Sequence, residues 1–439
     1  MSILNVNKIN PVGGGSTITI AGIASVTNNI SVGNSVTAGS FVGPIEGAVT
    51  GNVTGNVTGN ADTASGLSGN PSINTTGIVT ATSFVPTTGQ LSHRNIVVNG
   101  DFRIAQRATS STSSGIHSVD RFGVWYDNVD EAPTQEQYVM NSGDTGPWES
   151  GFRNALKVTN GNQTSGAGAD DYIWIQNLIE AQDIANSGWN YTSSSSYVTL
   201  SFWIKTSVSQ SYKCYLRTRD GTERQYPFET GTVSANTWTK IVKTIPGNSG
   251  LQFDNDVNQG LQINIGCFFG TNLTASGVTE NAWGSWSSTA RVPDMTSTWY
   301  TTNDAAFRIT GVQLEVGPVA TPFEHRPWNE EYLNCCRYYQ STIYVQSGNT
   351  YNVCATRAIG STVLQMTNVG FKTMMRSTPS VVIYNGTEAN KVRSSGGGNI
   401  TLNSVTVGGI PHGINYLSVS SGLTNGEWYQ FNYTADAEL

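Results

Sequence analysis

Three consecutive copies of the tetrapeptide Val-Thr-Gly-Asn fill residues 49–60 and constrain the fold more than any other feature of the chain. In an extended strand, alternate side chains point to opposite faces, so one face of this tract carries only valine and glycine. A single ribbon with so narrow an apolar edge buries too little surface to offset the entropy lost on ordering. Several chains around one axis would bury the valines and approach closely at the glycines. The residues expected on this axis are Val49, Gly51, Val53, Gly55, Val57 and Gly59.

The surrounding segment, residues 1–92, has the composition of such a shaft. It carries very few charged side chains and no tryptophan or tyrosine, whereas all eleven tryptophans lie further along the chain. Residues 36–42 return in closely similar form as residues 79–85, and each copy ends near glycine or proline, as a strand closed by a turn does. The regular valines and isoleucines distinguish this segment from a flexible Gly/Ser linker. We therefore expect residues 1–92 to form a repetitive β shaft made of more than one chain.

Overall composition also favours extended β structure. Charged residues make up only 12% of the chain, so the high charge of a disordered protein is missing. A net charge of −7 gives no electrostatic support for a general polyanion-binding role. The N-terminus has no signal-peptide pattern, and no apolar run approaches the ~20 residues of a membrane span. We expect a soluble protein made in a reducing cytoplasm.

The five cysteines do not form a disulfide framework. Their number is odd, Cys335 and Cys336 are adjacent, and no Cys-x-x-Cys spacing is present for zinc. We expect free, buried thiols.

Residues 93–327 are predicted to form one all-β domain. Several segments alternate apolar and polar residues, as half-buried antiparallel strands do. Many short strands separated by turn residues favour a sandwich or jelly roll. The candidate strands are residues 172–176, 198–205, 211–217, 237–242, 261–266 and 307–314.

Residues 328–439 are predicted to form a short helix followed by a small second β-sandwich. Tyr332, Cys335, Cys336 and Tyr339 are spaced i, i+3, i+4, i+7 behind an acidic first turn, which is typical of a short amphipathic helix. The candidate strands beyond it are residues 361–366, 381–384, 415–419 and 428–433. The predicted fold class is therefore all-β, with an N-terminal fibrous shaft, a central jelly roll and a distal β-sandwich.

Several motifs resemble those of bacteriophage tail fibre proteins. Residues 94–107, which begin Arg-Asn-Ile-Val-Val-Asn-Gly-Asp-Phe, resemble the opening of a carbohydrate-binding-module-like jelly roll common in such fibres. Residues 309–317 and 320–327 resemble the closing strand and exit of the same domain. Residues 330–340 and 375–379 resemble parts of the distal domain, and the Val-Thr-Gly-Asn repeats resemble structural proteins of marine and cyanobacterial phages.

This resemblance implies a homotrimeric virion fibre. Its N-terminus would attach to tail or baseplate proteins, and its C-terminal domains would face the host surface. Nucleic acid and membrane insertion have no part in such a role.

Motifs for catalysis or metal binding are missing from the sequence. The four histidines, His93, His117, His325 and His412, have no metal-ligand spacing. Residues 254–260 begin like a calcium loop but lack its required glycine and glutamate. Jelly rolls of this type often hold a structural calcium, for which Asp101, Asp120 or Asp171 could supply oxygens. No carboxylate pair is singled out for glycan cleavage. We expect no enzyme, no metal site and no cofactor.

Aromatic side chains suited to stacking on sugars are plentiful. In residues 198–205, Trp203 points away from the face of Leu200 and Phe202, and Trp174 likewise lies opposite Ile173. An alternative is that both faces of these strands are buried. The glycan-binding candidates are Trp148, Trp174, Trp203, Trp283, Trp286, Trp428 and Tyr429.

The sequence thus favours a tail fibre that attaches a virion to host-surface polysaccharide. One alternative is a purely structural virion component, such as a capsid fibre or tail connector. A more distant alternative is a polysaccharide-cleaving tailspike.

Overall fold

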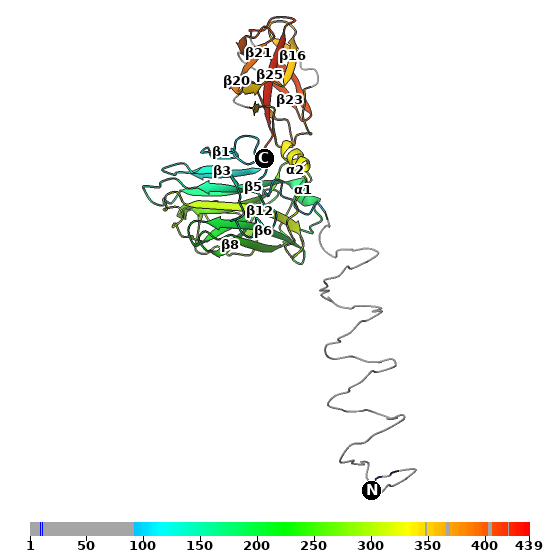
Figure 1. Ribbon diagram of the computed structural model, residues 1–439. Helices are drawn as coiled ribbons and strands as arrows, with labels where there is room; N and C mark the ends of the chain where they lie inside the picture. Colours follow the sequence, from blue (N-terminus) through cyan, green and yellow to red (C-terminus); the bar gives the residue numbers. More distant parts are fainter. Residues whose placement is uncertain are drawn as a thin grey trace, which may run out of the picture. The chain divides into compact units, whose positions relative to one another are not determined.

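The computed structural model describes residues 92–346, 349–365, 369–402, 406–419 and 421–439, together with Ile9 and Pro11. Apart from Ile9, Pro11 and Ser92, the predicted shaft lies outside the described residues, together with its axis residues Val49 to Gly59. The chain divides into two compact units, Met1–Thr80 and Ala81–Leu439. The second unit holds both folded β regions (Figure 1).

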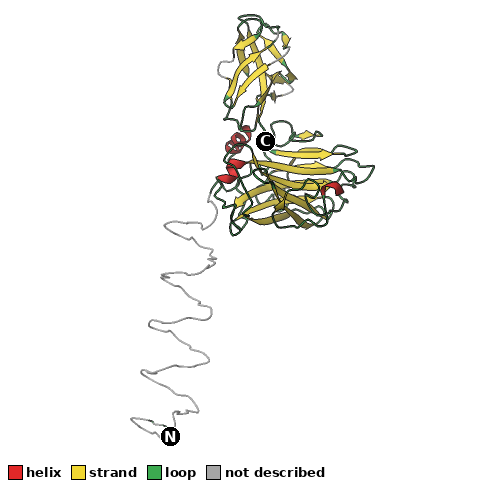
Figure 2. Cartoon of the chain, turned by 180° about the vertical axis from the view of Figure 1, so that it is seen from behind, coloured by secondary structure: helices red, strands yellow, loops and turns green. Residues whose placement is uncertain are grey.

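The central region is a sandwich of two six-stranded antiparallel sheets. Sheet A has, in spatial order, β1 (Ser110–Ser111), β3 (Thr134–Val139), β4 (Asn154–Thr159), β12 (Ala306–Val316), β6 (Tyr197–Thr206) and β9 (Thr239–Pro246). Sheet B has β11 (Gly284–Ser285), β8 (Arg224–Val233), β7 (Gln210–Thr218), β10 (Gln259–Phe269), β5 (Tyr172–Glu180) and β2 (Phe122–Asp127). The predicted all-β fold is confirmed, and strands dominate both folded regions in Figure 2.

The core of this sandwich follows from the alternation in the strands. Leu200, Phe202 and Ile204 on β6 are fully buried in one apolar cluster, together with Ile173 and Ile175 on the facing β5. Each such side chain contributes roughly 2 kcal/mol through burial. The intervening residues point outward, and on these outer faces lie two of the aromatic candidates, Trp203 of β6 and Trp174 of β5.

Helices are short and lie beside the sheets. α1 (Ala181–Ala185) follows β5 directly, η2 (Thr271–Leu273) follows β10, and α2 (Trp328–Cys336) links the two β regions. The predicted amphipathic helix is present as α2, but it ends three residues earlier than Tyr339. Tyr339 instead opens the strand β13 (Tyr339–Ser341), where it pairs with Asp436. Among the described residues, no helix is long and apolar enough to cross a membrane.

The distal region is a set of short antiparallel strands arranged around one long strand, β25 (Trp428–Asp436). The first half of β25 pairs with β16 (Cys354–Ala358) and β21 (Lys391–Ser394), and its second half pairs with β13 and β19 (Ser380–Asn385). The remaining strands are β14 (Tyr344–Gln346), β15 (Asn349–Tyr351), β17 (Val363–Gln365), β18 (Val369–Gly370), β20 (Glu388–Ala389), β22 (Asn399–Thr401), β23 (Thr406–Ile410) and β24 (Gly413–Ser418).

Buried ion pairs join the distal region to the central sandwich. Arg121, only 2% exposed, forms an ion pair with Glu438 and stacks on the ring of Tyr338 at 3.4 Å. Arg337 makes two hydrogen bonds of 2.7 Å to the buried carboxylate of Glu180 at the end of β5. Because each charge is desolvated and paired, removal of one partner would leave the other uncompensated.

Candidate functional site

 The outer face of sheet A carries a cavity of about 240 Å³, which we call the sheet A cavity. The sheet A cavity is lined by Ser150, Phe152, Ser201, Trp203, Lys240, Gly311, Pro322, Phe323 and His325. Strand register explains why Trp203 reaches it: on the outer face, Trp203 of β6 lies between Lys240 of β9 and Thr310 of β12.

Residues 140–153, between β3 and β4, form one wall of this site. Gly146 lies against the indole of Trp203, where an added Cβ would be 3.0 Å from the ring. Trp148 is half-buried in the same apolar cluster as Trp203, and the guanidinium of Arg153 lies 3.8 Å from its ring centroid. The structure therefore brings two of the predicted aromatic residues, Trp148 and Trp203, to one face.

A buried carboxylate holds this wall in place. Asp144 accepts hydrogen bonds from Trp238 Nε1 at 2.9 Å and from Lys205 Nζ at 3.2 Å. Burial acts to raise the pKa of Asp144, but these hydrogen bonds and one from the Asn141 amide outweigh burial and lower the pKa below its ordinary value. The carboxylate is thus ionised and already satisfied by protein donors.

The opposite wall comes from the middle of β12 and from the segment that follows this strand. Gly311 adopts φ +65°, and Phe152 packs so closely that an added Cβ would lie 2.6 Å from its ring. Phe152, Phe323 and His325 form a cluster with ring centroids 4.9–5.0 Å apart. His325 Nε2 lies 2.9 Å from the carbonyl oxygen of Ser150, so this nitrogen carries the proton and donates.

The outer face of sheet B carries a second aromatic group. Trp174 stacks on Tyr172 at 4.2 Å, and both belong to a cluster with Tyr215 and Trp286. The guanidinium of Arg217 lies 3.8 Å from the ring centroid of Trp286. Trp174 is only 9% exposed because this cluster covers it. Trp174 and Trp286 are therefore brought together, but largely as packing partners.

Sequence reasoning missed Trp125, which lies beside this cluster. Trp125 is paired in register with Trp174, is 38% exposed, and its indole lies over Gly123. The signal was available, because Phe122, Val124 and Tyr126 alternate with Gly123 and Trp125 in the same way as the residues around Trp203 do.

The remaining candidates lie elsewhere. Trp283 donates from Nε1 to the carbonyl of Pro246 at 2.7 Å and lines a separate cavity of about 400 Å³ at the edge of sheet B. Trp428 opens β25 and is 54% exposed. Tyr429 has no exposed surface and lies in the distal core, where its hydroxyl accepts from the Thr424 amide. A side chain in this position does not face a ligand, so Tyr429 does not belong to a binding surface.

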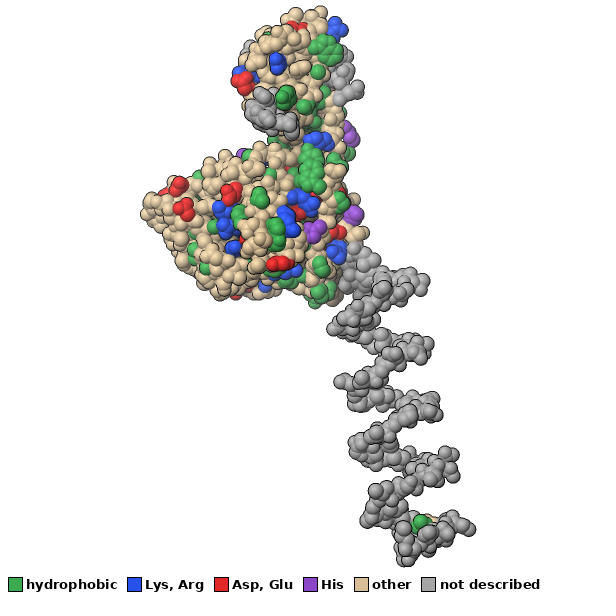
Figure 3. Space-filling model, in the orientation of Figure 1, with side chains coloured by type: hydrophobic (Ala, Val, Ile, Leu, Met, Phe, Trp, Pro, Cys, Tyr) green, Lys and Arg blue, Asp and Glu red, His purple; other side chains and the backbone are tan. Residues whose placement is uncertain are grey.

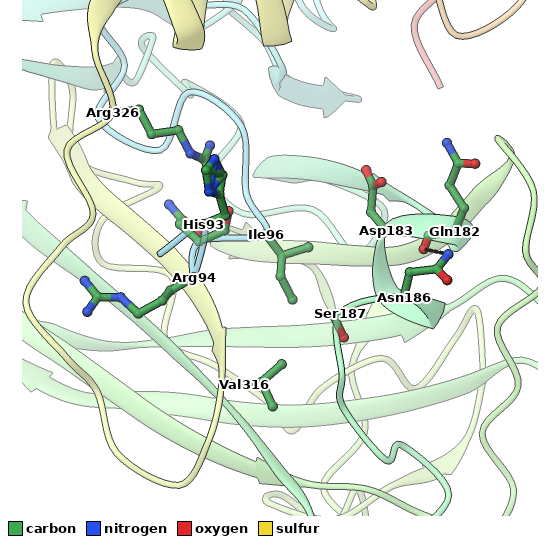
Figure 4. Close-up of a pocket in the computed structure, with 10 residues that line it drawn as sticks. His93, Arg94, Ile96, Gln182, Asp183, Asn186, Ser187, Val316 and Arg326 are labelled. Atoms are coloured by element: carbon green, nitrogen blue, oxygen red, sulfur yellow. Dashed lines mark hydrogen bonds between the residues drawn. The ribbon is translucent and has the colours of Figure 1, made fainter. Parts of the chain in front are cut away.

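A cavity of about 360 Å³ lies beside α1, where the central sandwich begins (Figure 4). Gln182, Asp183 and Asn186 line one side, Arg94 and Arg326 the other, and Ile96 and Val316 lie between them. Burial, reinforced by Glu180, raises the pKa of Asp183 to about 6. Arg326 is already bonded to backbone carbonyls of Asn95 and Val97. This cavity has no aromatic wall and lies apart from the predicted candidates.

The carboxylates considered for calcium each have protein partners. Asp101 forms an ion pair with Arg103, Asp120 accepts from the Gln106 amide and side chain, and Asp171 accepts from Tyr300 Oη at 2.9 Å. Within the part of the chain that the structure describes, no group of three or more His, Cys, Asp or Glu side chains could hold a metal ion. The five cysteines carry free thiols, and four of them are buried.

No protein-family model matches this chain, and no curated protein matches it. Among solved structures, it is similar to the enzymatically active domain of tailspike protein 4 of bacteriophage CBA120, with 11% identity and a TM-score of 0.27 over 51% of this chain and 21% of that chain. It is also similar to a family 11 carbohydrate-binding module of Clostridium thermocellum, with 12% identity and a TM-score of 0.24 over 47% of this chain and 95% of that chain. The N-terminal cellulose-binding domain of Cellulomonas fimi β-1,4-glucanase C has 7% identity and a TM-score of 0.24 over 49% and 99% of the two chains. Likenesses this low carry no argument about ligands or residues.

Proposed function

We propose that this chain is a non-enzymatic bacteriophage tail fibre that attaches the virion to host-surface glycan through its C-terminal β regions. The observation that carries the proposal is the sheet A cavity, in which the aromatic side chains of Trp203, Phe152 and Phe323 lie beside polar groups. Sugars present apolar C–H faces that pack on aromatic rings and hydroxyls that need hydrogen-bond partners. A cavity with both kinds of group suits one or more sugar rings.

The sequence resemblance supports the same proposal from another direction. The closing motif that resembles the jelly roll of tail fibres, residues 309–317 and 320–327, supplies Gly311, Pro322, Phe323 and His325 to the cavity. Residues 1–92 would form the trimeric shaft and bind tail or baseplate proteins, and the mature fibre would reside on the virion.

Binding of the full-length chain to whole cells tests the proposal. Fluorescently labelled protein is mixed with a panel of bacteria that includes cyanobacteria, and extracted lipopolysaccharide is added as competitor. We expect binding to at least one strain that lipopolysaccharide prevents, with no release of reducing sugar. Trp203→Ala should reduce binding, whereas Val242→Ala, at an exposed position on the same face of sheet A but outside the cavity lining, should not.

Binding to no strain, or binding that neither lipopolysaccharide nor Trp203→Ala reduces, contradicts the proposal. Release of reducing sugar would contradict its non-enzymatic part.

A further inference from the structure

The ionisable side chains that line the sheet A cavity are all of one kind. Lys240 and His325 are the ionisable side chains in its lining, and both are basic. Lys240 is exposed on β9, and none of the described carboxylates forms an ion pair with it. A cation at the rim of an otherwise aromatic and hydroxyl-lined cavity favours a ligand that carries negative charge.

Three carboxylates of the strands and loops around this face accept hydrogen bonds from protein donors, and none of them forms an ion pair with Lys240. Asp144 is held by Lys205 and Trp238, as described above. Glu315 is 2% exposed and accepts from the amide and hydroxyl of Thr321 at 2.8 and 2.6 Å. Glu149 accepts from the backbone amide of Gly146. The charge of Lys240 is therefore left for solvent or for a ligand.

A row of cations runs across the same outer face. Strand register places Lys205 of β6, Arg308 of β12 and Lys157 of β4 side by side. Lys205 and Lys157 are paired with Asp144 and Glu136. Arg308 lies over the ring of Tyr138 at 4.8 Å, and its buried Nε has no hydrogen-bond partner. Because the two lysines are neutralised by their partners, the positive potential that this row adds to the face comes from Arg308.

We propose that the sheet A cavity binds an acidic sugar residue, a uronic acid or a chemically similar carboxylated sugar. The sugar ring packs against Trp203, and its carboxylate pairs with the ammonium of Lys240. Ser201 offers a hydroxyl donor, and the hydroxyl of Ser150, which donates to the carbonyl oxygen of Gly146 at 2.8 Å, can accept from a sugar hydroxyl. This inference rests on the proposed function and names the ligand class for the same site.

A second explanation for Lys240 is protection of the sheet edge, and a control variant distinguishes it from ligand binding. β9 is an edge strand of sheet A, and lysines on edge strands discourage pairing with other chains. Lys243 lies on the same strand, and its Nζ donates to Asn281 Oδ1 at 2.8 Å, outside the cavity lining. Lys240→Gln and Lys243→Gln therefore make the same change in net charge on the same edge strand, but only the first changes the cavity.

The test measures binding of the full-length chain to oligosaccharides in matched pairs that differ only in a carboxylate at C6. The pairs are glucuronate and glucose, galacturonate and galactose, and mannuronate and mannose oligomers of equal length. We expect the uronate of the preferred pair to bind at least about tenfold more tightly than its neutral match. Lys240→Gln should remove this preference, which corresponds to about 1.4 kcal/mol. Lys243→Gln should keep it, and both variants should retain the wild-type melting temperature.

The outcomes separate this inference from the proposed function. Equal binding of neutral and acidic members, or an equal loss in Lys240→Gln and Lys243→Gln, overturns the acidic-sugar assignment while glycan attachment stands. If lipopolysaccharide prevents cell binding but the chain binds no uronate, the acidic-sugar assignment is likewise overturned and glycan attachment stands. If the chain binds neither cells nor any oligosaccharide, the proposed function itself is wrong.

Discussion

At the scale of single residues, the cavity depends on a backbone conformation that only one residue type adopts easily. Gly311 combines φ +65° with close contact to Phe152, and it lies at an irregularity in the pairing of β12 with β6. We expect Gly311→Ala to destabilise the chain by about 1–3 kcal/mol in urea unfolding, through strain and steric conflict together. Gly166 has φ +81° with nothing within 4 Å, so Gly166→Ala measures strain alone. Equal losses in the two variants would contradict the predicted conflict with Phe152.

Asp120 gives a residue-scale prediction for pH. Burial raises its pKa to about 6, against opposing hydrogen bonds from Gln106. The folded state therefore holds a proton between about pH 4 and pH 6 that the unfolded state releases, so this group makes stability fall as pH rises through that window. Asp120→Asn removes the titration. We expect the difference in unfolding free energy between wild type and variant to change by about 1–3 kcal/mol between pH 4 and pH 6.5. Parallel pH curves for the two proteins would contradict this.

At the scale of elements, the end of β25 and the tail after it connect the distal region to the central sandwich. Glu438 pairs with Arg121, which is almost fully buried, whereas Asp436 pairs with Arg107 and has a side chain that is 44% exposed. Glu438→Gln should cost about 3 kcal/mol because it leaves a buried cation without its counter-charge. Asp436→Asn should cost less than about 1 kcal/mol. Urea unfolding of both variants measures the difference, and a small effect of Glu438→Gln would contradict the buried pair.

The sequence predicts elements better than the contacts between them. Alternation alone places Trp203 and Trp174 opposite their buried neighbours, and it would have placed Trp125 too. Alternation cannot show that Trp174 is covered by Trp286 from a distant loop. It does place Tyr429 on the same face as Phe431 and Tyr433, so the burial of Tyr429 in the distal core could have been predicted. Alternation also cannot show that Lys240 and His325 line the same cavity. The position of Lys240 there follows from strand register, and that of His325 follows from the path of residues 320–327. Local pattern fixes the face of a side chain, whereas the neighbours on that face come from residues far away in the sequence.

At the scale of the whole molecule, the distribution of side chains predicts a division of roles along the chain. On the visible face of the folded unit, charged side chains are scattered over a surface made mainly of backbone and uncharged side chains (Figure 3). Residues 1–92 lack the tryptophans and tyrosines that usually dominate recognition. Deletion of residues 1–60 should therefore abolish incorporation into particles and leave cell binding by the truncated chain intact, as measured on virions and on purified protein. Loss of cell binding in this deletion would contradict the division.

Assembly of the full chain is the last prediction, and it follows from the Val-Thr-Gly-Asn repeats. If Gly55 lies on a crowded axis between chains, then Gly55→Val adds a branched side chain where backbones approach and should weaken association. Thr54 lies on the opposite face of the same strand, so Thr54→Val introduces the same residue one position away and should leave association unchanged. Sedimentation velocity at micromolar concentration measures both variants against the wild-type chain, for which we expect a trimer. A monomeric wild-type chain, or equal weakening by the two variants, would show that the valine and glycine face does not form the axis.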